Sequence, residues 1–131
     1  MKKALIHVTN IAYKHNENEY DSFRSEGRTP LNIGFGLSLL NYEVNIICNE
    51  WNFTEQKKVW NNVILSKSPI HNHYDIAITF STFDNLMNIK PDLKFNRGMS
   101  IVYEKSHIIN TMYFIESTGI NLDYIVLHEE S

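Results

Sequence analysis

Short apolar runs, separated by polar segments, recur along the whole chain. The runs are rich in β-branched residues and are apolar at successive positions, a pattern typical of strands that are covered on both faces of a sheet. They predict six strands, over residues 4–9, 43–48, 62–66, 75–80, 99–105 and 123–128.

The clearest helix signal lies between the first two of these strands. An apolar stripe at helical spacing is formed by Ile33, Leu37 and Leu40. Thr29 and Pro30 indicate where the helix starts, because a hydroxyl residue is a good N-cap and proline suits the first helical position. Asn41 stands where a left-handed residue commonly ends a helix. The short return to the next strand predicts a βαβ unit with parallel strands.

Weaker patterns fill the other connections. Residues 106–119 predict a further helix, and residues 51–61 and 82–90 are expected to form short helices or irregular crossovers. Residues 10–28 carry polar and turn-forming residues and predict a long loop. Strands that alternate with helices in this way predict a single domain over residues 1–131, a Rossmann-like three-layer α/β/α sandwich with a mainly parallel sheet.

Composition narrows the class of protein. The chain has 131 residues, with 12 basic and 15 acidic residues, a net charge of −3 and no basic run, so the electrostatic footprint of a nucleic-acid binder is missing. Its one cysteine, Cys48, cannot form an internal disulfide, which fits a reducing compartment. His7, Thr9 and Asn10 interrupt the first apolar run too early for a signal peptide, and no run is long enough to span a membrane. These features predict a cytoplasmic protein with no nucleic-acid partner.

The order of motifs along the chain carries a resemblance. A strand, a loop that ends in glycine and a helix rich in small and apolar residues lead into the turn Asn41-Tyr42-Glu43-Val44. Later segments read HYDIAITFS (73–81), MSIVYEKSH (99–107) and LDYIVLHEES (122–131). This series resembles the N-terminal, acceptor-side domain of GT-B glycosyltransferases, in which the first helix commonly ends in a Gly-His-Glu-Val type turn.

The resemblance implies a binding role and also shows two departures. The family usually has two adjacent glycines in its first loop, whereas this chain has Gly27 followed by Arg28 and Thr29. GT-B enzymes also hold most nucleotide-sugar contacts in a second Rossmann-like domain, before which this sequence stops. The resemblance therefore implies an acceptor-binding half, truncated, split or a remnant, that does not transfer sugar alone. Its partners would be a sugar or glycan acceptor, a nucleotide-sugar held by a second domain or subunit, and a hetero- or homo-oligomeric partner chain.

Two segments provide candidate substrate-binding residues. Gly27, Arg28 and Thr29 lie at the predicted helix start, where free amides, the helix dipole and an arginine favour an anion. Glu104 and His107 follow the fifth predicted strand at its carboxyl end, where open α/β sheets bind their ligands. A solvated loop arginine and surface charges that cap the next helix are the simpler alternatives. No catalytic residue, cofactor or metal site is predicted.

For the other residues with reactive or ligating side chains we expect a structural role. Gly34 and Gly36 do not complete a dinucleotide fingerprint, and we expect both to let the helix pack closely on the sheet. His71 and His73 are expected on one face of a strand without a third metal ligand, and His7 as a core histidine. Two further functions stay open: a stand-alone Rossmann-like module that binds a nucleotide or another anion, and a partner subunit with no small-molecule site.

Overall fold

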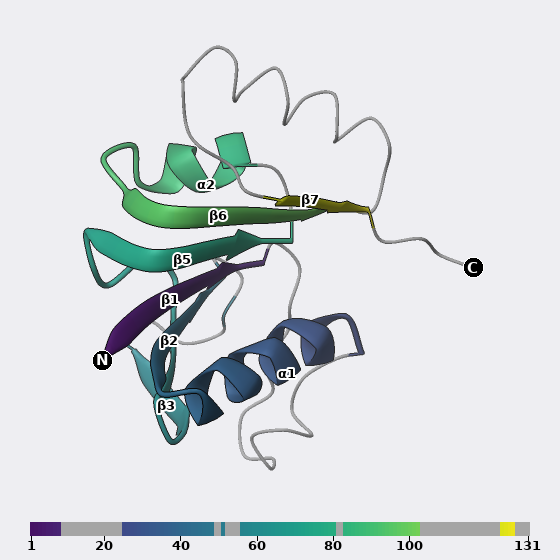
Figure 1. Cartoon of the computed structure of the whole chain (residues 1–131), viewed down its shortest axis with the longest axis vertical. Helices are drawn as coiled ribbons and strands as arrows, with labels where there is room; N and C mark the ends of the chain where they lie inside the picture. Colours follow the sequence, from purple (N-terminus) through teal and green to yellow (C-terminus); the bar gives the residue numbers. More distant parts are fainter. Residues whose placement is uncertain (9–24, 49–50, 52–55, 81–82, 103–123, 128–131) are drawn as a thin grey trace.

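A computed structural model of the chain describes residues 1–8, 25–48, 51, 56–80, 83–102 and 124–127. The elements in chain order are β1 (Lys2–His7), α1 (Ser25–Leu39), β2 (Tyr42–Ile47), β3 (Lys57–Trp60), β4 (Val63–Ser66), β5 (His73–Thr79), α2 (Phe83–Ile89), β6 (Lys94–Val102) and β7 (Tyr124–Leu127). The strands form one sheet in the order β3-β4-β2-β1-β5-β6-β7 (Figure 1). All pairs in it are parallel except β3 with β4. The predicted α/β fold with a mainly parallel sheet is therefore confirmed.

Each of the six predicted strands is present, and one further strand was missed. Residues 51–61 were expected to form a helix or an irregular crossover, but Lys57–Trp60 forms the antiparallel edge strand β3. β3 turns back into β4 through Asn61, whose φ of 43° is in the left-handed region. Its register shifts between Lys58 and Trp60, and its two lysines suit a sheet edge. A short, charged edge strand lacks the apolar run by which the buried strands could be recognised.

The start of α1 differs from the prediction. The helix begins at Ser25, so Thr29 is not its N-cap and Pro30 lies inside it. Pro30 is the sixth residue of the helix and lies beyond the first four, whose amides have no helical partner, so the expectation that it stands at the first helical position is wrong.

The end of α1 follows the prediction. Asn41 has a φ of 68° and donates its amide to the Ser38 carbonyl at 3.1 Å, as expected for the residue that terminates a helix.

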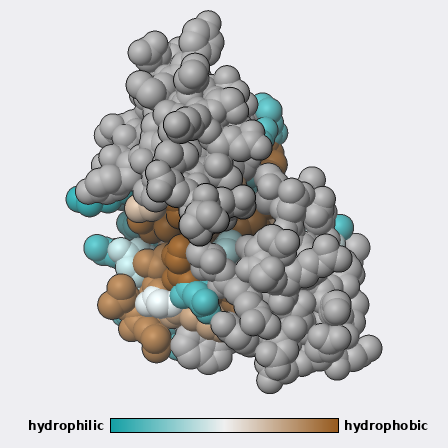
Figure 2. All heavy atoms as spheres, turned by 90° about the vertical axis from the view of Figure 1, so that its right-hand side faces the viewer, coloured by the Kyte–Doolittle hydropathy of each residue, from teal (hydrophilic) through white to brown (hydrophobic). Residues whose placement is uncertain are grey.

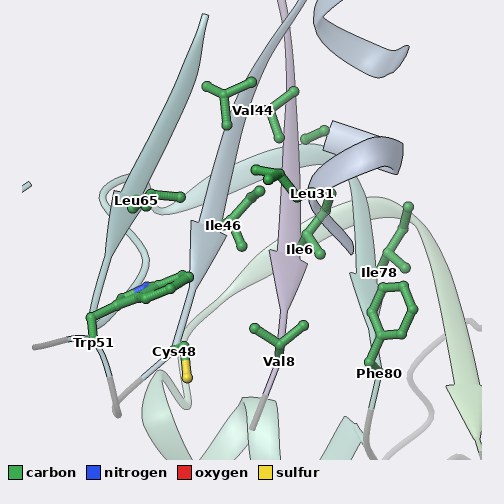
Figure 3. Packing of buried hydrophobic residues seen from close by; sticks show 12 residues of the cluster. Ile6, Val8, Leu31, Val44, Ile46, Cys48, Trp51, Leu65, Ile78 and Phe80 are labelled. Atoms are coloured by element: carbon green, nitrogen blue, oxygen red, sulfur yellow. The ribbon is translucent and has the colours of Figure 1, made fainter. Parts of the chain in front are cut away.

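One face of the sheet is covered by α1. Alternate residues of β1 and β2 point toward it and pack in one cluster with Leu31 (Figure 3). Gly34 makes the close approach possible, since a Cβ there would lie 3.0 Å from Ile46 Cδ1. Gly36 has no such neighbour within 4 Å, so the packing role predicted for it is wrong. Leu40, predicted in the apolar stripe, lies beyond the end of the helix and is 72% exposed.

The opposite face of the sheet carries a second, smaller core. Leu86 of α2 packs there with Leu5, Ala77 and other buried residues, so residues 82–90, expected as a short helix or an irregular crossover, contain a short helix. The two described helices therefore lie on opposite faces, but the full three-layer arrangement stays a prediction. Residues 106–119, the other predicted helix, lie outside the described residues. Within the part that is described, no helix is long and apolar enough to cross a membrane.

Candidate functional site

The sheet has a topological switch point between β1 and β5. β1 continues through α1 to β2 on one side, whereas β5 continues through α2 to β6 on the other side and over the opposite face (Figure 1). The chain therefore leaves the carboxyl ends of these neighbouring strands in opposite directions. In open α/β sheets a crevice at such a point is where ligands bind.

A buried polar pair joins the two strands at this point. His7 and Thr79 are the last residues of β1 and β5 and are register partners. The imidazole Nδ1 of His7 lies 2.9 Å from the Thr79 hydroxyl oxygen, and Phe80 donates its amide to the His7 carbonyl at 2.9 Å. Ser100, the register partner of Thr79 on β6, is also buried and extends the row across a third strand.

The row is electrically neutral near pH 7. His7 is 3% exposed, and this burial lowers the pKa of its imidazole from 6.5 to about 4. The ring is then neutral and has one N–H donor and one acceptor, while the hydroxyls of Thr79 and Ser100 can each donate and accept. These buried groups hydrogen-bond within the sheet, as His7 does with Thr79, and they supply no cation beneath the edge. The expectation that His7 is a core histidine is consistent with its burial.

Gly27, Arg28 and Thr29 lie in the first turns of α1, where the structure describes their backbone only. Because α1 leads from the end of β1 to the start of β2, its N-terminus faces the same edge as the carboxyl ends of β1 and β5 (Figure 1). Amides without a helical partner occur in the first turn, so Gly27 is better placed than Thr29 to offer one. Glu104 and His107 lie outside the described residues, and a site shared by the two segments stays a prediction.

Among the described residues, the large hydrophobic side chains that are exposed, Met1, Leu39, Leu40 and Ile89, lie at the opposite, amino-terminal edge of the sheet. Figure 2 looks onto the side toward which β1 and β5 run in Figure 1, and hydrophobic side chains are visible there beside polar ones.

A second polar cluster lies under the segment that connects β4 to β5. Its centre is Asn45, a buried residue of β2. The side-chain amide of Asn45 donates to the Ser66 hydroxyl at 2.8 Å and to the Ile64 carbonyl at 3.2 Å. Its oxygen accepts from the Tyr74 hydroxyl at 2.8 Å and from the Ile70 amide at 3.1 Å.

These bonds give Asn45 a structural role. The connection from β4 to β5 passes β2 and β1 in the sheet, and residues 67–72 contain no helix. Asn45 and Tyr74 hold this segment by hydrogen bonds where a helix would normally pack. Asn45 was not singled out from the sequence, although a lone amide within an apolar strand was a detectable signal.

The two histidines near β5 do not form a site together. His71 precedes the strand, so the expected placement of both rings on one strand face is wrong. Its Nε2 lies 3.3 Å from Glu43 Oε2, an approach that does not amount to a hydrogen bond, whereas His73 Nε2 lies 2.9 Å from Asn96 Oδ1. Among the described residues, no group of three or more histidines, cysteines or carboxylates could hold a metal ion.

No protein-family model, curated protein or solved structure matches the chain. The function must therefore be argued from the topology and the chemistry of the switch point.

Proposed function

We propose that this chain is a Rossmann-like three-layer domain that binds a polar small molecule at the carboxyl edge of its sheet, as the acceptor-binding half of a GT-B glycosyltransferase. The observation that carries the proposal is the switch point between the parallel neighbours β1 and β5, from which the chain adds strands in opposite directions across the sheet, with the His7–Thr79 pair joining the two strands. When β3 is left aside and the six parallel strands are numbered along the chain, their order across the sheet is 3-2-1-4-5-6, which is the order of the classic dinucleotide-binding sheet.

The chemistry beneath this edge supports an uncharged, hydroxyl-bearing ligand such as a sugar acceptor. The buried row of His7, Thr79 and Ser100 contains hydrogen-bonding groups and no charge near pH 7. Three described lysines on β1 and β6, namely Lys2, Lys3 and Lys94, lie at the opposite, amino-terminal ends of the strands. A phosphate would find no positive charge in this buried row, whereas an uncharged, hydroxyl-bearing ligand does not need one.

An anion- or nucleotide-binding module is the second candidate. It is favoured by the N-terminus of α1, which faces the same edge and offers amides and a positive dipole end, with Arg28 close by in the sequence. This candidate predicts that phosphate or a nucleoside diphosphate binds without any sugar.

The donor sugar would be supplied by a second domain or a partner subunit, as the GT-B resemblance implies. Transfer requires donor and acceptor to be held together in one cleft, so we expect residues 1–131 alone to bind but not to turn over. A cytoplasmic location fits the single buried cysteine, Cys48.

Chemical-shift mapping on the ¹⁵N-labelled chain tests the proposal. The probes are maltose, inorganic phosphate, UDP and UDP-glucose, each titrated separately. We expect maltose to shift the amides of Val8 and Phe80, which follow the ends of β1 and β5, while those of Lys2 and Tyr42 at the amino edge stay unchanged.

Each outcome separates the candidates. Shifts at the carboxyl edge with phosphate and UDP but not with maltose would refute the acceptor-binding proposal and support the anion-binding module. Shifts confined to the amino edge, or none with any probe, would refute a ligand site at the switch point.

A further inference from the structure

We draw no further inference here: the strongest candidate, the exposed apolar patch of Met1, Leu39 and Leu40 at the amino-terminal edge of the sheet, carries no proposal because nothing in the structure shows what covers it.

Discussion

The two glycines of α1 allow the packing of helix on sheet to be measured with a matched pair of substitutions. Gly34→Ala and Gly36→Ala add the same methyl group to the same helix, two residues apart. Alanine is more favourable than glycine in a helix by about 1 kcal/mol, and this gain is common to both variants. The difference between their stabilities therefore reports the surroundings of the added methyl group.

Those surroundings differ sharply. At position 36 no atom lies within 4 Å of the added carbon, so we expect the variant to be more stable than the wild type by about 0.5–1 kcal/mol. At position 34 the added carbon would lie 3.0 Å from Ile46 Cδ1 and 3.4 Å from Val44 Cγ1. Both side chains are buried and cannot move into solvent, and overpacking of this kind costs about 1–3 kcal/mol. We therefore expect Gly34→Ala to be less stable than Gly36→Ala by about 1–3 kcal/mol.

Urea unfolding followed by circular dichroism at 222 nm measures both free energies of unfolding. The packing argument also predicts the outcome of a double-mutant cycle with Ile46→Val, which removes the Cδ1 atom at the closest contact. That change alone should cost about 0.5–1.5 kcal/mol and should cost less in the Gly34→Ala background. Equal stability of the two alanine variants, or purely additive effects in the cycle, would show that Gly34 is not a packing residue.

Three further predictions concern polar and turn residues. Asn45→Ala should lower the free energy of unfolding by about 2–4 kcal/mol, because it leaves its buried hydrogen-bond partners unsatisfied. The control Asn96→Ala, on the exposed surface, should change it by less than about 0.5 kcal/mol in the same urea assay, and similar losses in both variants would contradict the role given to Asn45. Burial lowers the pKa of His7 to about 4, so its contribution to stability is complete above pH 6.5 and should be lost as the pH falls toward 4, by on the order of 3 kcal/mol. In His7→Gln the free energy of unfolding should therefore depend less on pH between 6.5 and 4, and an unchanged pH dependence would refute the assignment. Asn41→Gly should leave the melting temperature equal or higher, since glycine adopts a φ of 68° without strain, whereas Asn41→Val should lower the free energy of unfolding by about 1–2 kcal/mol. A valine variant more stable than the glycine variant would exclude a left-handed cap.

Local pattern alone determined much of the fold. The six buried strands were recognisable because strands covered on both faces are apolar at successive positions, and their alternation with helical segments indicated parallel pairing. Asn41 was recognisable for a similar reason, since the left-handed end of a helix restricts the residue types that fit there. In each case a few consecutive residues carry the whole physical cause.

The tertiary structure decided the features whose causes lie far apart in the chain. β3 is a strand because it pairs with β4, although its own residues show no strand pattern. Gly34 and Gly36 lie two residues apart in one helix, and the sequence gives the same prediction for both. Only the position of Ile46 in the folded sheet shows that Gly34 packs closely and Gly36 does not.

The pairing of His7 with Thr79 at the candidate site could not be predicted from the sequence. The two residues are 72 positions apart, and nothing in the sequence near either one indicates that they are neighbours. The order of the strands brings them together at the switch point and, by burying His7, keeps its imidazole neutral. Sequence periodicity specifies which face of an element is buried, but the identity of the neighbours on that face follows only from the arrangement of the whole sheet.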